Sequence, residues 1–192
     1  MNTSGAITLG IIVLVVLYGI FLYNALVQLK HDVAKAWANI DVLLKQRHDE
    51  LPKLVEVCRQ YRDFEQATLE RVIAARGQVE TASRSQDMNA LGLAESQLRA
   101  GTLRLFAVAE AYPELKANEH FMQLQARITS LENGIADRRE LYNESVNLFN
   151  VRIEQFPDLV VAKLGSFPPA SLLEFASSEK SDVDLSSLFN KN

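Results

Sequence analysis

The chain has 192 residues, of which 48% are hydrophobic, and its formal net charge is −4. This length accommodates one domain with its own core and an additional segment. The acidic balance, without a cluster of Lys and Arg, excludes the basic surface that nucleic-acid binding requires. The single cysteine, Cys58, excludes an intramolecular disulfide, and its apolar helical context predicts a small buried side chain.

The N-terminal segment has the composition of a membrane span. The first 29 residues carry no charge, and residues 6–23 form an uninterrupted apolar run. As a helix, this run and its uncharged flanks can cross a bilayer core of about 30 Å. A cleaved signal peptide is the alternative, but it would need a basic n-region and a small-residue cleavage site, which this segment lacks. We therefore predict an uncleaved transmembrane anchor that contacts the lipid bilayer through residues 6–23.

Basic residues near the ends of the span predict its orientation. None precedes the apolar run, whereas Lys30, Lys35, Lys45 and Arg47 follow it. This asymmetry favours an N-terminus outside and a folded domain in the cytoplasm. A periplasmic domain is the alternative orientation.

The chain from Leu26 to Phe156 predicts helices, because good helix formers dominate it and strand patterns are absent. The first soluble helix is expected to continue from the anchor and to end near His48. Asp49 would then cap the next helix, and Pro52 would lie in its first turn. A kink at Pro52 within one longer helix is the competing interpretation.

Later helix boundaries follow from turn and cap signals. The second helix is expected to fade in TASRSQD, residues 81–87, and the third to stop at Pro113, which disfavours the helical conformation at Tyr112. Asn118 is a suitable N-cap for the fourth and longest helix, which runs to about Phe156. Its predicted core face consists of Phe121, Leu124, Ile128, Leu131, Ile135, Tyr142, Val146, Phe149 and Ile153.

Together these segments predict an all-α fold. An N-terminal transmembrane helix is followed by an antiparallel up-and-down four-helix bundle with a mostly extended C-terminal tail. The predicted domains are residues 1–25 (N-terminal segment and anchor), 26–157 (helical bundle) and 158–192 (tail rich in Ser and Pro). The expected anchor points of the tail are Phe167, Phe175 and Phe189.

Polar residues at heptad spacing mark the fourth helix. Gln125, Glu132 and Arg139 are seven residues apart, and so are Asn143 and Asn150. Seven residues are nearly two turns, so each set forms a stripe along one side of the helix, as in a coiled coil. The stripe is either a hydrogen-bonded seam that fixes helix register or a groove that binds a partner.

Within this polar stripe, we expect Arg139 to be mostly buried and to meet a carboxylate from another helix. Asp32 and Glu95 lie at suitable heights for that contact. Glu132 is expected to bind Lys35 or to hydrogen-bond within its own helix. A slip of one turn would then leave a buried ion unpaired, at a cost of several kcal/mol.

Enzyme signatures are largely absent from the sequence. It contains no Glu-x-x-His pair, no H-E-x-x-H motif, no Gly-rich phosphate loop and no G-x-S-x-G elbow. His31, His48 and His120 lie on three different predicted elements. We therefore predict no catalytic residue, no metal and no cofactor. A Glu65 and Glu132 pair acting as general acid and base is the enzymatic hypothesis that stays open.

Several longer motifs carry a family resemblance. They are AWANIDVLLKQRHDELPKLVE, VAEAYPELKAN, and E-x-x-I-x-x-x-R-x-x-Y-N followed by FN and FP. In these motifs the chain resembles the LemA family, over nearly its whole length. The resemblance implies a single-pass bacterial membrane protein with a cytoplasmic four-helix bundle, and a part in magnetosome membrane formation for some relatives. Arg138 stands where relatives usually have a small residue, so it is expected to point outward.

Two functional classes follow from the sequence. The preferred one is a non-enzymatic, membrane-tethered scaffold or adaptor at the bacterial inner membrane, which binds an unknown membrane or cytoplasmic protein or self-assembles. The alternative is an undescribed membrane-associated hydrolase or metal enzyme that uses carboxylates of the bundle. The anchor lacks a G-x-x-x-G motif, so a homo-oligomer would form through the bundle or the tail.

Overall fold

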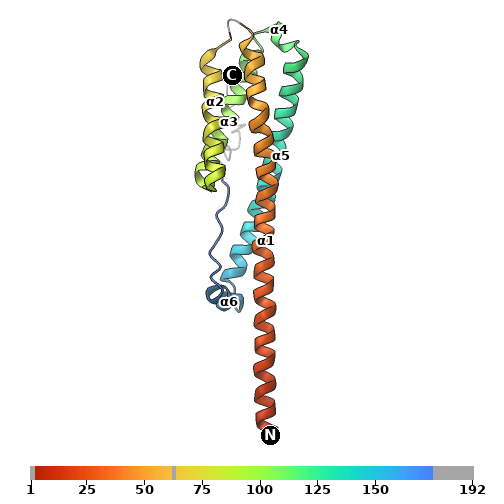
Figure 1. Ribbon diagram of the computed structural model, residues 1–192, viewed down its shortest axis with the longest axis vertical. Coiled ribbons are helices and arrows are strands. Elements are labelled where there is room, and N and C mark those ends of the chain that lie inside the picture. The colour runs from red at the N-terminus through yellow and green to blue at the C-terminus, as the bar shows by residue number, and fades with distance from the viewer. Residues whose placement is uncertain (1–2, 62–63, 175–192) are drawn as a thin grey trace, which may run out of the picture. The chain divides into compact units, whose positions relative to one another are not determined.

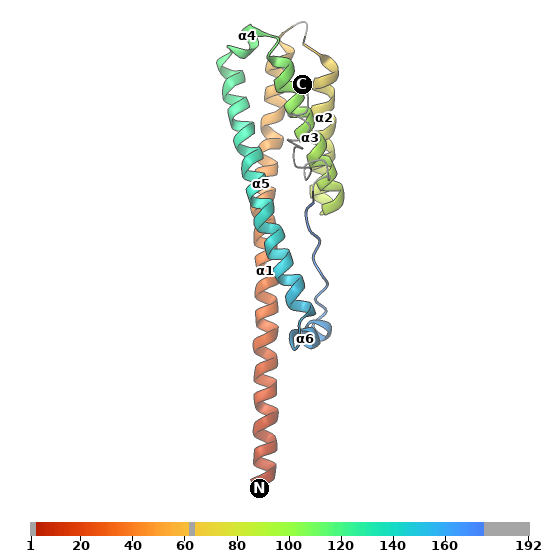
Figure 2. The same ribbon diagram turned by 180° about the vertical axis from the view of Figure 1, so that it is seen from behind.

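A computed structural model describes residues 3–61 and 64–174, which form helices and no strand. The helices, shown in Figure 1 and from behind in Figure 2, are α1 (Thr3–Arg59), α2 (Gln66–Ser85), α3 (Met88–Ala109), α4 (Pro113–Lys116), α5 (Glu119–Glu154) and α6 (Asp158–Leu164). The all-α prediction is therefore confirmed.

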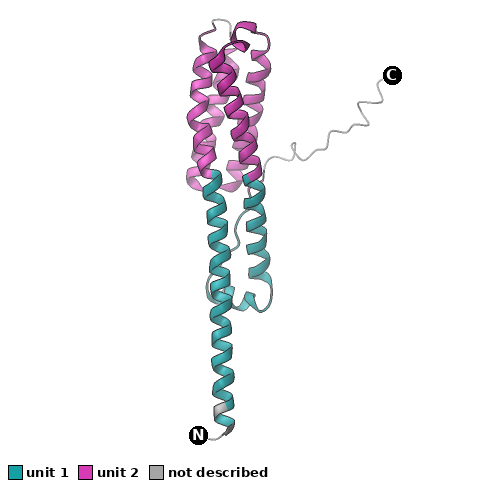
Figure 3. Ribbon diagram, turned by 90° about the vertical axis from the view of Figure 1, so that its right-hand side faces the viewer, with its two compact units in different colours: residues 1–40, 138–172 teal, residues 41–137, 173–192 magenta. Residues whose placement is uncertain are grey.

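The chain divides into two compact units, coloured in Figure 3. Unit 1 comprises residues 1–40 and 138–172, and unit 2 comprises residues 41–137 and 173–192. These units are defined by packing. The domain boundaries after residues 25 and 157 rest on amino-acid composition, and they stay predictions.

The N-terminal part of α1 has the character of a membrane span. Among the described residues, α1 is the one helix that is long and apolar enough to cross a membrane, with a mean hydropathy of 2.4 over an 18-residue window. Its large apolar side chains are exposed from Ile7 to Phe21, whereas Leu22 and Leu26 are buried. An apolar helix this exposed needs an apolar environment, which a bilayer supplies.

The predicted break at Pro52 is wrong, because α1 continues through this residue to Arg59. Proline lacks the N–H that would bond the carbonyl four residues earlier, here that of His48. Arg76 of α2 supplies the missing donor, with its Nε 2.9 Å from the His48 carbonyl oxygen. A side chain 28 residues away thus satisfies the acceptor that the proline leaves open.

α1 ends at Arg59 and α2 begins at Gln66, and no Gly or Pro in the sequence between them signals this change. The described residues on either side contact the region around α4. The Tyr61 hydroxyl donates to the Glu114 carbonyl (3.3 Å), and the buried Phe64 ring lies 5.4 Å from the Tyr112 ring. Tertiary contacts of Tyr61 and Phe64 therefore mark this change of helix, which has no local sequence signal.

The predicted end of the second helix and the predicted start of the longest helix agree with the structure. α2 ends inside TASRSQD, where Gln86 has a φ of 53° and closes the helix in the left-handed conformation. Asp87 then caps α3, since its Oδ1 accepts the backbone N–H of Ala90 (3.0 Å). Asn118 caps α5 in the same way, accepting the N–H of Phe121 (3.1 Å).

Unit 2, magenta in Figure 3, has a core of apolar side chains between its helices. Its larger members are Leu44, Leu51, Leu54, Val55, Leu69, Val72, Val79, Leu91, Leu98, Leu105, Phe121, Ile128, Leu131 and Ile135. The predicted core face of α5 is buried except for Leu124, which is half-buried. Cys58 is also buried, as predicted, and desolvation raises the pKa of its thiol to about 12.

Unit 1 brings α1, α5 and α6 together. Leu26, Phe149, Ile153 and Ala162 form its core cluster. The tail was predicted to be mostly extended, but it begins with the helix α6. Phe167 anchors the segment after α6, with its ring 6.5 Å from that of Phe149. The other two expected anchor points, Phe175 and Phe189, lie outside the described residues.

Replacing Arg76 with Met tests how α1 passes Pro52. The change leaves the partly buried His48 carbonyl without its donor, so we expect a loss of roughly 1–3 kcal/mol in the free energy of unfolding. In a Pro52→Ala background the helix supplies its own N–H, so the same change should cost less. Urea unfolding of the four proteins measures this coupling, with the exposed Arg71→Met as a control. Equal losses in both backgrounds would contradict the account.

Candidate functional site

A buried ion pair joins α1 to α3 in unit 2. Arg47 Nη2 donates a hydrogen bond to Glu95 Oε1, and the two side chains are only 2% and 3% exposed. Moving two charges out of water is costly, and their attraction repays this cost only while both are present. Loss of one partner of such a pair typically costs 3–5 kcal/mol, which makes this pair a strong constraint on the register of the two helices.

Glu132 of the predicted polar stripe lies beside this pair. Desolvation raises the pKa of its carboxyl group, opposed by the charges of Arg47 and Arg99 and supported by that of Glu95. Among the described residues, neither Glu132 Oε1 nor Arg47 Nε, both buried, has a hydrogen-bond partner. Two acids and two arginines thus form a charged cluster in which burial raises the pKa of one carboxyl group.

A second polar cluster surrounds His48. Arg76 Nη2 contacts the His48 ring at Nε2, and Glu80 Oε2 lies 3.5 Å from the same nitrogen. Burial, and next the charge of Arg76, lower the pKa of His48. The imidazole is therefore held neutral at pH 7, and it serves as a contact for the arginine that satisfies the α1 backbone.

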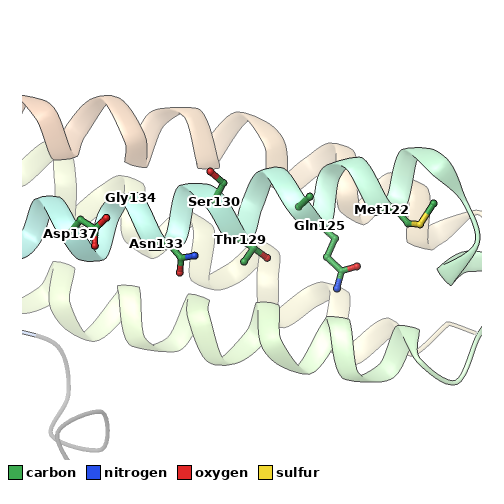
Figure 4. A pocket seen from close by; sticks show the side chains of 8 residues that line it. Met122, Gln125, Thr129, Ser130, Asn133, Gly134 and Asp137 are labelled. Carbon is green, nitrogen blue, oxygen red and sulfur yellow. The ribbon is translucent and has the colours of Figure 1, made fainter.

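Gln125, the first residue of the stripe, borders a shallow groove on the outer face of α5. Small and polar side chains line it, and Figure 4 shows them along one stretch of the helix. They are Met122, Gln125, Ala126, Thr129, Ser130, Asn133, Gly134 and Asp137. Gly134 also permits close approach to α1, since a Cβ there would lie 3.3 Å from Leu43 Cδ1. The groove is open to solvent, so it suits contact with another surface better than enclosure of a small molecule.

Asn150, the last residue of the stripe, holds the segment after α6. Its Nδ2 donates to the Ala170 carbonyl and its Oδ1 accepts the Ala170 N–H, both at 2.9 Å. About two turns earlier in α5, the Tyr142 hydroxyl donates to the Ser171 carbonyl (2.9 Å). These side chains replace backbone partners for an extended segment that has no strand beside it.

Arg139 and Asn143, the other two stripe residues, belong to unit 1 and are half-buried. Glu95, one of the two acids expected for Arg139, forms its ion pair with Arg47. The other, Asp32, accepts a hydrogen bond from Gln28 (3.1 Å). Arg138 is exposed, as expected. Whether the stripe as a whole is a register seam or a binding surface stays a prediction.

Sequence reasoning missed the partner of Glu95. The sequence predicts no inward contact for Arg47, although it stands four residues after Leu43 and three after the buried Leu44. Its place beside the apolar face of α1 was a signal that it points inward. Because the predicted helix ended near His48, Arg47 fell in its last turn, where a basic side chain is favourable without being buried.

The described residues bear on two enzymatic hypotheses, an acid–base pair of carboxyl groups and a metal site. Glu65, half of the hypothetical acid–base pair, forms an ion pair with Arg104 Nη2 (3.1 Å). A hydrogen bond with Thr68, opposed by desolvation, and the contacts with Arg104 give Glu65 a lowered pKa. Among the described residues, no group of three or more His, Cys, Asp or Glu side chains is placed to hold a metal ion.

Because the pKa of Glu132 is raised, the free energy of unfolding should depend on pH in a way that can be measured. Between the ordinary carboxyl value of 4.5 and the raised folded value, the folded state binds more protons than the unfolded chain, so stability falls as pH rises. Glu132→Gln is neutral at every pH. We expect it to exceed the wild type in stability at neutral pH, and the difference to shrink as pH falls toward about 4.5. Denaturant unfolding across this range measures the difference.

The matched control for Glu132→Gln is Glu144→Gln, at an exposed position of the same helix. It should leave the pH dependence of unfolding unchanged. If Glu132→Gln instead lost stability at neutral pH, the charged carboxylate would be contributing through the arginines, and the assignment of desolvation as the dominant cause would be wrong.

Comparison with known proteins gives consistent matches. The chain is 25% identical over 169 residues to Protein LemA of Metamycoplasma hominis, covering 87% of this chain and 75% of the relative. Magnetosome protein MamQ 2 of Paramagnetospirillum magneticum is 30% identical over 71 residues, which cover 37% of this chain and 26% of that protein. Magnetosome protein MamQ of Magnetospirillum gryphiswaldense is 23% identical over 168 residues, covering 76% and 62%.

The alignments reach different shares of the relatives. The chain spans three quarters of the mycoplasma protein and less than two thirds of the MamQ proteins. The model of the LemA family matches residues 36–186, which include the charged cluster, the groove on α5 and α6. On this match over most of its length, the chain belongs to the LemA family.

Proposed function

We propose that the protein is a membrane-tethered helical scaffold or adaptor at the bacterial inner membrane. It binds protein partners or assembles with copies of itself. The observation that carries the proposal is the continuity of α1, a single helix that begins in the exposed apolar segment and contributes Arg47 to the buried ion pair of unit 2. A partner bound to this unit is thereby tethered to the membrane.

We propose that unit 2 is an antiparallel up-and-down four-helix bundle. Contacts between pairs of its helices support this arrangement: Arg47 with Glu95 joins α1 to α3, and Arg76 with His48 joins α2 to α1. A bundle held by buried charges presents fixed outer faces, which is the property that a docking surface needs.

The groove on α5 is the docking surface that this proposal assigns. Its small side chains let another helix approach closely, while Asn133 and Ser130 offer hydrogen bonds and Asp137 offers one charge. Side chains of this kind lose little conformational entropy when a partner covers them, because they have few rotatable bonds. The relatives named MamQ are magnetosome proteins, which is compatible with a role in organising membranes.

The proposed orientation places unit 2 in the cytoplasm. The four basic residues after the apolar run support it, since basic residues are retained on the cytoplasmic side. A cysteine introduced at the exposed Gln78 should resist a membrane-impermeant thiol reagent in intact spheroplasts and react after lysis. The buried Cys58 can stay in place, with the wild type as blank. Rapid labelling before lysis would establish the opposite orientation.

A photoreactive amino acid at Asn133 tests the docking surface. In the full chain in native membranes, we expect adducts of discrete mass from this exposed groove position, including one at twice the mass of the 21.5 kDa chain if copies assemble. The same group at Glu70, exposed on α2 outside the groove, is the control. Equal yields from both positions, or none from Asn133, would reject the groove as the docking surface.

A further inference from the structure

The apolar side chains around α6 face away from the folded unit. Phe156 is 83% exposed and Leu164 is 84% exposed, and Val160 between them is 50% exposed. Val160 and Leu164, four residues apart, share one face of α6, and Phe156 precedes them by the same interval. On a helix at a water-exposed surface, the outer face is normally polar.

Another face of α6 packs against the rest of unit 1. Ala162, a small residue, packs in the cluster with Leu26 and Phe149. The Asp158 carboxylate is buried and accepts a hydrogen bond from Arg152 Nε at 2.7 Å. α6 thus directs Ala162, the partly buried Val161 and a paired acid toward the protein. Val160 and Leu164 point outward, where water would favour polar side chains.

α6 lies at the level where α1 leaves the bilayer. The two helices are adjacent in both views (Figures 1 and 2), and Ala162 packs in one cluster with Leu26. A bilayer core of about 30 Å takes about 20 helical residues, so a span that begins at Ile7 ends near Leu26. Consistently, the near-continuous run of exposed apolar side chains on α1 ends at Tyr23, and the first charge is Lys30.

Residues suited to the headgroup region surround α6. The rings of Tyr23 and Phe167 meet edge to face, with centroids 5.6 Å apart. Lys30 Nζ lies 6.0 Å from the centroid of the Phe167 ring, and Lys163 is exposed in the last turn of α6. Aromatic rings and long basic side chains favour this depth, where one end meets acyl chains and the other meets water and phosphate.

We propose that α6 is a second membrane contact, lying in the boundary between headgroups and acyl chains of the bilayer that α1 crosses. Phe156, Val160 and Leu164 insert among the lipids there. The occupant is lipid because the apolar face lies at the end of the lipid-exposed surface of α1. This inference rests on the proposed membrane anchor. A helix in the plane of the interface, fixed to a spanning helix, restricts the tilt and rotation of unit 1.

The test uses the full chain in vesicles of phosphatidylethanolamine and phosphatidylglycerol, with an environment-sensitive fluorophore on a cysteine that replaces Leu164. Cys58 stays in place because it is buried and its thiol has a raised pKa. Lipids that carry a nitroxide near the headgroup quench probes at that depth. We expect strong quenching and a blue-shifted emission for the probe at Leu164.

Two further probe sites separate the outcomes. Leu14 is 68% exposed within the span and should be quenched most by a nitroxide deep in the acyl chain. Leu141 is 52% exposed and precedes Tyr142, whose ring meets that of Trp37, about 16 Å along α1 beyond Leu26. The probe at Leu141 should not be quenched. Circular dichroism of each labelled protein verifies that it keeps its helical content.

Quenching at Leu14 without quenching at Leu164 would overturn the inference and leave the anchor intact. Absence of quenching at both sites would overturn the anchor, and the inference with it. Equal quenching at Leu164 and Leu141 would also reject the inference, because it would place α6 and the distal part of unit 1 at the same depth.

Discussion

The hydrogen bond from Arg76 to the His48 carbonyl allows α1 to continue as a helix past Pro52. A proline in the middle of a helix normally costs about 3 kcal/mol and often ends it. Here the acceptor left open by Pro52 is satisfied from α2, so one helix joins the apolar N-terminal segment to the core of unit 2. The tether and the first helix of the folded unit are therefore the same element.

Buried charges give unit 2 a specific register at a cost in stability. The Arg47–Glu95 pair is nearly inaccessible to water, and an apolar pair of equal volume is often as stable or more so. The pair penalises any helix shift that separates its members. Glu132 adds a carboxyl group whose proton is favoured by burial, so the same region makes the stability of unit 2 depend on pH.

Sequence reasoning succeeded where a local signal decides the structure. The uncharged N-terminal run, the Asn118 cap and the apolar face of α5 each depend on neighbours within a few residues. It failed where a distant residue decides. The course of α1 past Pro52 depends on Arg76, and the end of α1 at Arg59 depends on contacts such as that of Tyr61 with Glu114.

The polar positions of the candidate site could be predicted from the sequence, but their contacts could not. Heptad spacing identified Glu132 and Asn150 as polar positions on α5, but their roles depend on elements that come from elsewhere in the chain. Asn150 bonds the backbone of a segment that was predicted to be mostly extended. The outward apolar face of α6 was also missed, because the segment after Pro157 was predicted to be mostly extended, and an extended segment has no helical face.

The central claim is that α1 is one helix on both sides of Pro52. Spin labels on the exposed positions Asp41 and Glu56, in the full chain in lipid vesicles, measure this directly. Fifteen residues of continuous helix separate their attachment sites by about 22 Å. If α1 is one helix, the distances between the two spin labels form one narrow distribution near that value. A hairpin at Pro52 would bring the two sites to about 10 Å, the spacing of adjacent helices, and that result would contradict it.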